Sequence, residues 1–160
     1  MLDAMAARGS RILDAGCGTG RVGGRLAQLG HTVVGVDVDP ALIDYATTDF
    51  PAATWLVGDL ALLDLPAAGI AEPFDLVFAA GNVLGFLAPS TRVPTLENLR
   101  NHLADDGRVV LAYGAGRGYA FDDFFADLAT AGLSLDLALS TWELHPFTDK
   151  SNFLVAIARR

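Results

Sequence analysis

The chain has 160 residues, of which 52% are hydrophobic, and its formal net charge is −8 at pH 7. A chain of this length fits a single domain with its own core. Charges and glycines interrupt the apolar runs before the ~20 residues that a membrane span needs, and the negative charge opposes binding to nucleic-acid phosphates or anionic lipids. The single cysteine, Cys17, excludes an intramolecular disulfide, so we expect a reducing, cytoplasmic location.

Short apolar segments predict buried strands, and stretches with apolar residues at helical spacing separate them. This alternation indicates a parallel sheet that is covered on both faces. In chain order, the expected strands are Arg11–Ala15, Thr32–Val36, Thr54–Val57, Phe74–Ala79 and Arg108–Tyr113. The expected helices are Arg21–Leu29, Ala41–Thr48, Arg92–Ala104 and Phe121–Ala131. The tail predicts an antiparallel hairpin made of Leu133–Leu144 and Asn152–Arg159.

Glycines and one serine mark the expected helix ends. Gly30, Gly107 and Gly132 follow helical stretches where a left-handed C-terminal cap would fall. Ser90 precedes the 92–104 stretch and is its expected N-cap.

The stretch RILDAGCGTGRVGG, Arg11–Gly24, is the first candidate for a ligand site. Gly18, Gly20 and Gly23 form G-x-G-x-x-G directly after a strand and at the start of a helix, a context typical of a dinucleotide-binding turn. The alternative is a tight turn that binds no ligand. Asp14 stands just before the glycines, where it would repel a pyrophosphate and attract an ammonium or sulfonium. The ligand is therefore expected to carry positive charge.

Two more carboxylates end the next two strands. The two oxygens of Asp37 could accept hydrogen bonds from the hydroxyls of a ribose, and Asp59 could accept from an exocyclic adenine amine. Each aspartate is also a common N-cap or turn residue, which is the alternative interpretation. Ligands bind beyond the carboxyl ends of parallel strands, so the occurrence of Asp14, Asp37 and Asp59 after successive strands favours one binding rim.

These residues give the sequence a resemblance to the class I S-adenosylmethionine-dependent methyltransferases over nearly its whole length. LDAGCGTG (Leu13–Gly20) resembles the first motif of that family, GVDVDP (Gly35–Pro40) its ribose-binding segment and VGDL (Val57–Leu60) its adenine-binding segment. FDLVFAAGNVLGFL (Phe74–Leu87) resembles the fourth-strand motif, and LADDGRVVLAYGAG (Leu103–Gly116) the fifth strand. The resemblance implies an α/β fold: one doubly wound, mostly parallel Rossmann-like sheet of order 3-2-1-4-5-7-6, with an antiparallel C-terminal hairpin strand.

The resemblance also implies S-adenosyl-L-methionine as the cofactor. The backbone of the glycine turn would approach the methionine part and the ribose, and the three aspartates would lie near the ammonium, the ribose and the adenine amine. Two apolar residues would pack around the adenine, and two small residues after the fourth strand would face the methionine end and the path to the acceptor. The implied cofactor-binding residues are Asp14, Gly16, Cys17, Gly18, Gly20, Asp37, Val38, Asp59, Leu60, Ala80 and Gly81.

No catalytic residue is assigned, because methyl transfer from a sulfonium depends mainly on alignment and needs a base only where the acceptor must lose a proton. His145 is either such a base or a solvent-facing loop histidine. Arg117 either holds an anionic acceptor or lies in solvent within a glycine turn. Tyr119, Phe86 and Phe121 are expected to form an apolar wall beside it.

The acceptor is expected to be a small molecule. Enzymes that methylate the amino groups of nucleic-acid bases often carry Asn/Asp-Pro-Pro-Tyr/Phe after the fourth strand, where this chain has AAGNVLGF. Two alternatives remain: an NAD(P)-dependent oxidoreductase, which Asp37 and the glycine turn would permit, and an S-adenosylmethionine-binding protein without catalysis. No metal site is expected, because Cys17 has no partners at ligand spacing.

Only ten residues precede Arg11, whereas members of this family usually carry a helical segment that covers the site. We therefore expect residues 1–160 to form a single domain that lacks an N-terminal lid segment. The positive mean hydropathy is consistent with apolar surface that such a segment would cover. Uncovered apolar surface would favour a homo-oligomer.

Overall fold

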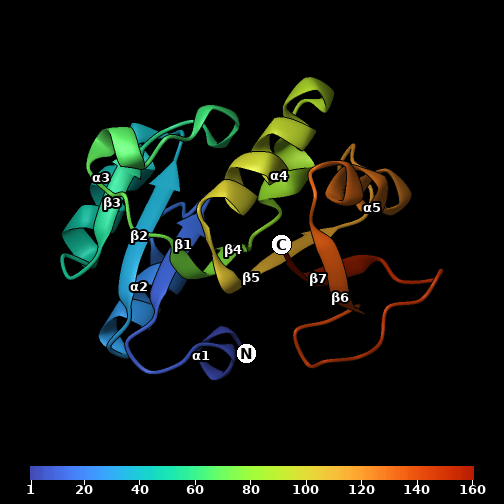
Figure 1. The fold of residues 1–160 in the computed structure, drawn as a ribbon, viewed down its shortest axis with the longest axis horizontal. Coiled ribbons are helices and arrows are strands. Elements are labelled where there is room, and N and C mark those ends of the chain that lie inside the picture. The colour runs from blue at the N-terminus through green and yellow to red at the C-terminus, as the bar shows by residue number, and fades with distance from the viewer.

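The computed structural model describes residues 1–160 and is built around one seven-stranded sheet (Figure 1). The strand order is β3-β2-β1-β4-β5-β7-β6, and β1 to β5 pair in parallel. β7 is antiparallel to both β5 and β6, which confirms the predicted order and the C-terminal hairpin. The strands are β1 (Arg11–Ala15), β2 (Thr32–Asp37), β3 (Thr54–Val57), β4 (Phe74–Ala79), β5 (Leu103–Gly114), β6 (Ser134–Leu139) and β7 (Phe153–Arg159).

Helices cover both faces of the sheet. The helices are α1 (Leu2–Met5), α2 (Arg21–Gln28), α3 (Pro40–Asp49), α4 (Arg92–Asn101) and α5 (Phe121–Thr130). α4 and α5 pack on one face through Leu96, Leu99, Phe124 and Leu128, and α1 and α2 cover the other. None of the five has the length and apolar character required to cross a membrane.

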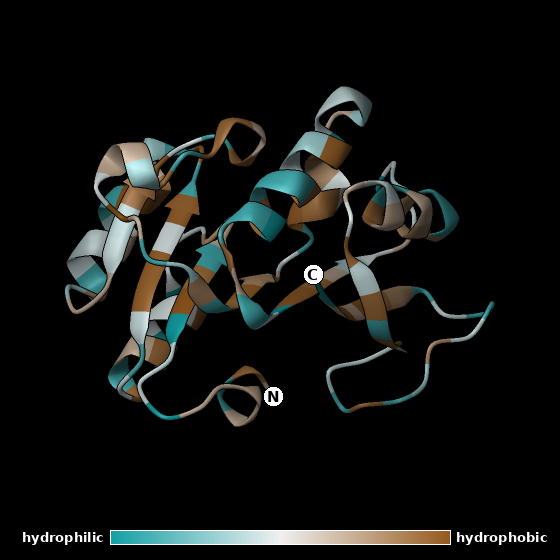
Figure 2. Cartoon of the chain, viewed as in Figure 1, coloured by the Kyte–Doolittle hydropathy of each residue, from teal (hydrophilic) through white to brown (hydrophobic).

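The strands in the middle of the sheet consist mostly of hydrophobic residues, which Figure 2 colours brown. In β4, Val77 and Ala79 join the core under α4 and α5, whereas Leu76 and Phe78 join the core under α1 and α2. Successive residues of a strand point to opposite faces, so a strand buried on both sides has a continuous apolar sequence. This explains why the apolar run of β4 located that strand in the sequence.

Two of the predicted helix ends are confirmed and two are wrong. Gly30 and Gly132 have positive φ values of 97° and 75° directly after their helices, as left-handed caps require. Gly107 instead lies inside β5, because α4 ends at Asn101 and the chain enters the strand at once. A Cβ atom on Gly107 would lie 2.9 Å from the carbonyl oxygen of Phe74, so this glycine permits close strand packing. Ser90 is not the N-cap of α4, which begins after Thr91 without a side-chain cap.

The last predicted strand pair is shorter than expected at the hairpin loop. β6 ends at Leu139, and the chain turns through Leu144, which has a φ of 71°. Between these two residues, Trp142 returns to the sheet face that α1 covers and packs against the core there.

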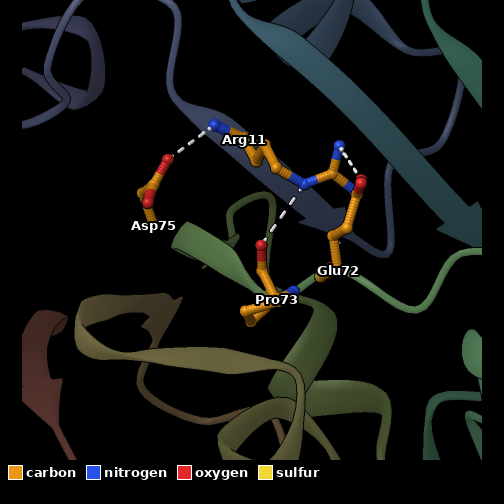
Figure 3. Close-up of polar contacts among 4 residues, drawn as sticks. All are labelled: Arg11, Glu72, Pro73 and Asp75. Atoms are coloured by element: carbon orange, nitrogen blue, oxygen red, sulfur yellow. Dashed lines mark hydrogen bonds and ion pairs between the residues drawn. The ribbon is translucent and has the colours of Figure 1, made fainter.

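The amino end of the sheet, far from the carboxyl ends of the strands, is held by Arg11 (Figure 3). Its backbone N–H donates to Asp75 Oδ2 at 2.8 Å, and its guanidinium forms an ion pair with Glu72 at 2.9 Å and donates to the carbonyl of Pro73 at 3.3 Å. These contacts fix the start of β1 against the start of β4.

Candidate functional site

A pocket of about 620 Å³ opens at the carboxyl ends of β1 to β4. Seven residues of the predicted cofactor set line it: Gly16, Gly18, Asp37, Val38, Asp59, Leu60 and Gly81. Its other walls are Asp39, Leu42, Gly58, Val83, Phe86, Leu87, Ala88 and Thr91. Ligands of open parallel sheets bind in this crevice.

Asp37 lies at the end of β2 with its carboxylate held in place. Its Oδ2 accepts the backbone N–H of Gly18 at 2.8 Å, and its Oδ1 accepts that of Asp39 at 3.0 Å. A carboxylate oxygen can accept more than one hydrogen bond, so both oxygens retain capacity for ligand hydroxyls. The side chain is therefore pre-oriented to hold a diol at the pocket wall.

Asp59 lies two residues after the end of β3 and caps the turn that follows. Its Oδ1 accepts the N–H of Ala61 at 2.9 Å and so caps the short 3₁₀ turn Leu60–Leu62. The capping interpretation of the sequence is therefore correct for this residue. Because only Oδ1 takes part in the cap, Oδ2 is left to accept a hydrogen bond from an amine in the pocket.

The glycine turn brings the backbone close to the ligand space. Gly16 and Gly18 have φ values of 77° and 55°, and a Cβ atom on Gly18 would meet no atom within 4 Å. The N–H groups of Gly16 and Cys17 both donate to the carbonyl of Val36, at 2.8 and 3.0 Å, which ties the turn to β2. The turn thus presents a bare stretch of backbone to the pocket.

Asp14 departs from the expectation that three aspartates share one rim. It is only 3% exposed and lies beneath the turn, where its Oδ2 accepts the N–H of Gly23 in the first turn of α2 at 3.0 Å. Burial is the main cause that raises the pKa of the Asp14 carboxyl to about 7; the Gly23 hydrogen bond opposes this rise, and the nearby charge of Asp37 adds to it. Asp14 therefore anchors the helix behind the pocket wall.

Three other members of the predicted set also lie outside the pocket. The side chain of Cys17 packs with Trp55 against α3, and burial raises the pKa of its thiol well above the usual range. Gly20 faces Trp55, since a Cβ atom there would lie 2.8 Å from the indole. Ala80 lines a neighbouring hollow of about 560 Å³ together with Arg21 and Trp142.

Several residues that line the pocket are not predicted as ligand-binding by the sequence. Leu42 follows from helical spacing, since it stands one turn into α3 behind the ribose segment. Val83 and Leu87 belong to the loop after β4, which was placed in a motif without individual roles. These residues reach the pocket because the loop folds back over the glycine turn, and this tertiary contact has no local signal in the sequence.

The acceptor-side residues divide into two groups. Phe86 is 75% exposed at the pocket, and the guanidinium carbon of Arg117 lies 6.0 Å from the centre of its ring. Tyr119 is instead buried, with its hydroxyl donating to Asp127 at 2.7 Å. Phe121 packs edge-on against Tyr113, so the prediction that Tyr119 and Phe121 form an acceptor wall is wrong. Both belong to the aromatic core beneath α5.

His145 lies on the exposed hairpin loop and does not line the pocket. Its backbone carbonyl accepts the N–H of Ser140 at 2.8 Å, which closes the turn after β6. The structure therefore agrees with the solvent-facing alternative for this histidine.

The fold and the pocket together define a class of protein. A mostly parallel sheet of order 3-2-1-4-5-7-6, with a glycine turn after β1, a fixed carboxylate at the end of β2 and a second carboxylate after β3, is the arrangement of a Rossmann-like methyltransferase. The residues that line the pocket suit an adenosine: hydrogen-bond acceptors for ribose hydroxyls and an exocyclic amine, with Val38, Leu42 and Leu60 as apolar walls.

A family model described as "Methyltransferase domain" matches residues 12–107. The chain therefore belongs to the family of class I S-adenosylmethionine-dependent methyltransferases. This membership decides against the NAD(P)-dependent oxidoreductase alternative.

Individual relatives agree with the family. The crystal structure of a TehB-like SAM-dependent methyltransferase from Corynebacterium glutamicum is 52% identical, has a TM-score of 0.93, and is matched over 99% of this chain and 84% of that one. The CcbJ methyltransferase of Streptomyces caelestis is 20% identical with a TM-score of 0.87, covers 98% of this chain and 85% of that one, and shares the fold. A magnesium-protoporphyrin O-methyltransferase from Rhodobacter capsulatus is 40% identical over 102 residues, 60% of this chain but only 43% of that relative.

Proposed function

We propose that this protein transfers the methyl group of S-adenosylmethionine to a small-molecule acceptor. The observation that carries the proposal is Asp37, whose two carboxylate oxygens are fixed by backbone N–H groups at the wall of a pocket that also presents Asp59 and the bare backbone of Gly18. A carboxylate held this way needs no reorganisation to accept the two hydroxyls of a ribose.

The residues of the pocket would hold the cofactor by its adenosine. Asp37 would accept hydrogen bonds from the ribose, and the free Oδ2 of Asp59 would accept from the adenine amine. Val38 and Leu60 would cover the faces of the adenine ring. When bound, the cofactor supplies an electrophilic methyl on a sulfonium with a neutral leaving group, so the protein mainly has to align the acceptor and exclude water.

The loop after β4 would form the wall on the acceptor side. Phe86 offers an exposed apolar surface, and the guanidinium of Arg117 lies beside its ring. An apolar face beside one cation suits a small acceptor with an apolar body and a negative group. No side chain at the pocket is assigned as a general base.

The names of some relatives include small-molecule or carrier-bound acceptors, and others include RNA. Besides the magnesium-protoporphyrin enzyme, a malonyl-[acyl-carrier protein] O-methyltransferase of Yersinia pestis is 38% identical over 55 residues, and an 18S rRNA (guanine-N(7))-methyltransferase of Bos taurus is 41% identical over 49 residues. The net charge of −8 disfavours contact with RNA phosphates, so we favour the small molecule.

Calorimetry with S-adenosylhomocysteine tests the cofactor part of the proposal, with NAD as the control ligand. We expect the first to bind and the second to give no heat of binding. A screen with methyl-labelled S-adenosylmethionine then tests the acceptor, with small carboxylates and total RNA as separate arms. Binding of NAD alone would overturn the proposal, and label incorporated only into RNA would overturn the acceptor class.

A further inference from the structure

Asn82 connects two loops at the mouth of the pocket, and the proposed function does not use it. Its Oδ1 accepts the backbone N–H of Gly114, the last residue of β5, at 2.8 Å. Asn82 itself comes three residues after the end of β4. One side chain therefore joins the ends of two neighbouring strands across 32 residues of sequence.

The backbone of Asn82 is in the left-handed region, with φ 68° and ψ 18°. Few residues other than glycine adopt this conformation, and asparagine is among those that tolerate it best. The side chain makes its hydrogen bond from this conformation, so the backbone geometry and the contact with Gly114 belong to one local arrangement.

The loop that Asn82 begins forms one wall of the cofactor pocket. Val83, Phe86 and Leu87 line the pocket, and Leu84 is fully buried in the core beneath them. The Cγ1 atom of Val83 would lie 2.7 Å from a Cβ atom on Gly16, so the loop rests directly on the glycine turn. A shift at Asn82 would be transmitted to this contact.

The partner of Asn82 begins the other loop at the mouth. Gly114 leads into the turn that carries Arg117, and the side chain of Arg117 lies against both Gly85 and Phe86. The bond between Asn82 and Gly114 therefore fixes the wall of the cofactor pocket and the Arg117 turn with respect to each other.

We propose that Asn82 is a positioning residue, which holds the Val83–Leu87 wall in register with the Arg117 turn by fixing its side-chain oxygen to the N–H of Gly114. This inference rests on the proposed function, since the wall matters only if the pocket binds the cofactor. The role belongs to the oxygen of the amide, which accepts the N–H of Gly114.

Three substitutions separate the contact from the backbone conformation. Asn82→Gly keeps the left-handed conformation without strain but removes the hydrogen bond. Asn82→Asp keeps an oxygen acceptor and tolerates the same conformation. Asn152→Gly is the matched control, since Asn152 is exposed at the start of the neighbouring strand and reaches the Arg117 turn through its backbone carbonyl, which bonds to Ala115.

The measurements are the affinity for S-adenosylhomocysteine by calorimetry and the hydrogen exchange rate of the Gly114 amide by NMR. We expect Asn82→Gly to weaken binding about 2- to 12-fold, the range of one net hydrogen bond, and to speed exchange at Gly114 by a similar or larger factor. We expect Asn82→Asp to restore both, and Asn152→Gly to change neither. A melting temperature within a few degrees of the wild type would show that each variant is folded.

The outcomes distinguish this inference from the proposed function. If the wild type does not bind S-adenosylhomocysteine, the proposed function fails. If the wild type binds and Asn82→Gly binds equally well, the positioning role is overturned. It is also overturned if Asn82→Asp keeps slow exchange at Gly114 but binds as weakly as Asn82→Gly, because the oxygen contact would then not be what matters.

Discussion

Val83 packs so closely onto Gly16 that no side chain fits at position 16. A Cβ atom there would overlap the Cγ2 methyl of Val83 and lie 2.7 Å from its Cγ1. Gly16 also has a φ of 77°, which disfavours any other residue. The glycine turn after β1 and the loop after β4 are therefore built as one wall.

Replacing Gly16 with alanine should damage the pocket through this contact. We expect Gly16→Ala to weaken S-adenosylhomocysteine binding by tenfold or more and to lower the free energy of unfolding by about 2–4 kcal/mol, since it adds overpacking to left-handed strain. Gly9→Ala is the control, because Gly9 has a φ of 74° but no atom within 4 Å of the added Cβ. It should cost only about 1–2 kcal/mol and leave binding intact.

The double substitution Gly16→Ala with Val83→Ala tests whether the contact with Val83 is what destabilises Gly16→Ala. Removing the two methyl groups of Val83 should recover part of the stability lost at Gly16, so the two effects would be non-additive. Strict additivity in urea unfolding would show that the strain at Gly16 does not come from Val83.

Asp37 is expected to contribute more to binding than its neighbour Asp39. Asp37→Ala removes an acceptor whose two oxygens are already oriented, and should weaken S-adenosylhomocysteine binding by about 1–3 kcal/mol in calorimetry. Asp39→Ala removes the N-cap of α3, where Oδ1 accepts the N–H of Ala41 at 2.8 Å. This control should cost about 1 kcal/mol of stability with little change in affinity. Equal losses of affinity in the two variants would contradict the ribose role of Asp37.

The sequence predicted the fold where local signals and tertiary packing agree. β4 has the predicted bounds because its apolar run 76–79 is buried on both faces of the sheet. Gly107 was misread because a glycine after a helical stretch resembles a cap, whereas the carbonyl of Phe74 on the neighbouring strand is what requires a glycine there. That contact joins residues 33 positions apart and has no local signal.

The candidate site shows the same division. Asp37 is the last residue of β2 and Asp59 lies two residues after β3, so the register of a parallel sheet was enough to bring them to one pocket. Asp14 also follows this logic in sequence, but its position on the strand turns its side chain toward α2. Tyr119 was assigned to the acceptor wall from proximity to Arg117 in the chain, although its bond to Asp127 draws it into the core.

The ion pair of Arg11 and Glu72 should add little to stability (Figure 3). The Glu72 side chain is 76% exposed, so solvent screens the charge and the side chain loses entropy when it is held. A double-mutant cycle with Arg11→Met and Glu72→Gln should give a coupling energy below about 1 kcal/mol. The backbone bond of Arg11 to Asp75 survives both changes, so affinity for S-adenosylhomocysteine should be unchanged. A coupling of several kcal/mol would mean that the pair is far less hydrated than its exposure indicates.

Asp14 should make the stability of the protein depend on pH. Its pKa is about 7 in the folded chain against a reference value of 3.8, so between about pH 4 and pH 7 the folded state binds the proton that the unfolded state has released. The contribution of Asp14 to the free energy of unfolding therefore falls as pH rises through this window and levels off above it. Asp14→Asn removes the titration and keeps an oxygen for the N–H of Gly23. Urea unfolding at pH 5, 6, 7 and 8 should show the stability of Asp14→Asn rising relative to the wild type from pH 5 to 7. Parallel curves for Asp14→Asn and the wild type would mean that the carboxylate is already ionised at pH 5, and that the N–H of Gly23 outweighs the cost of its burial.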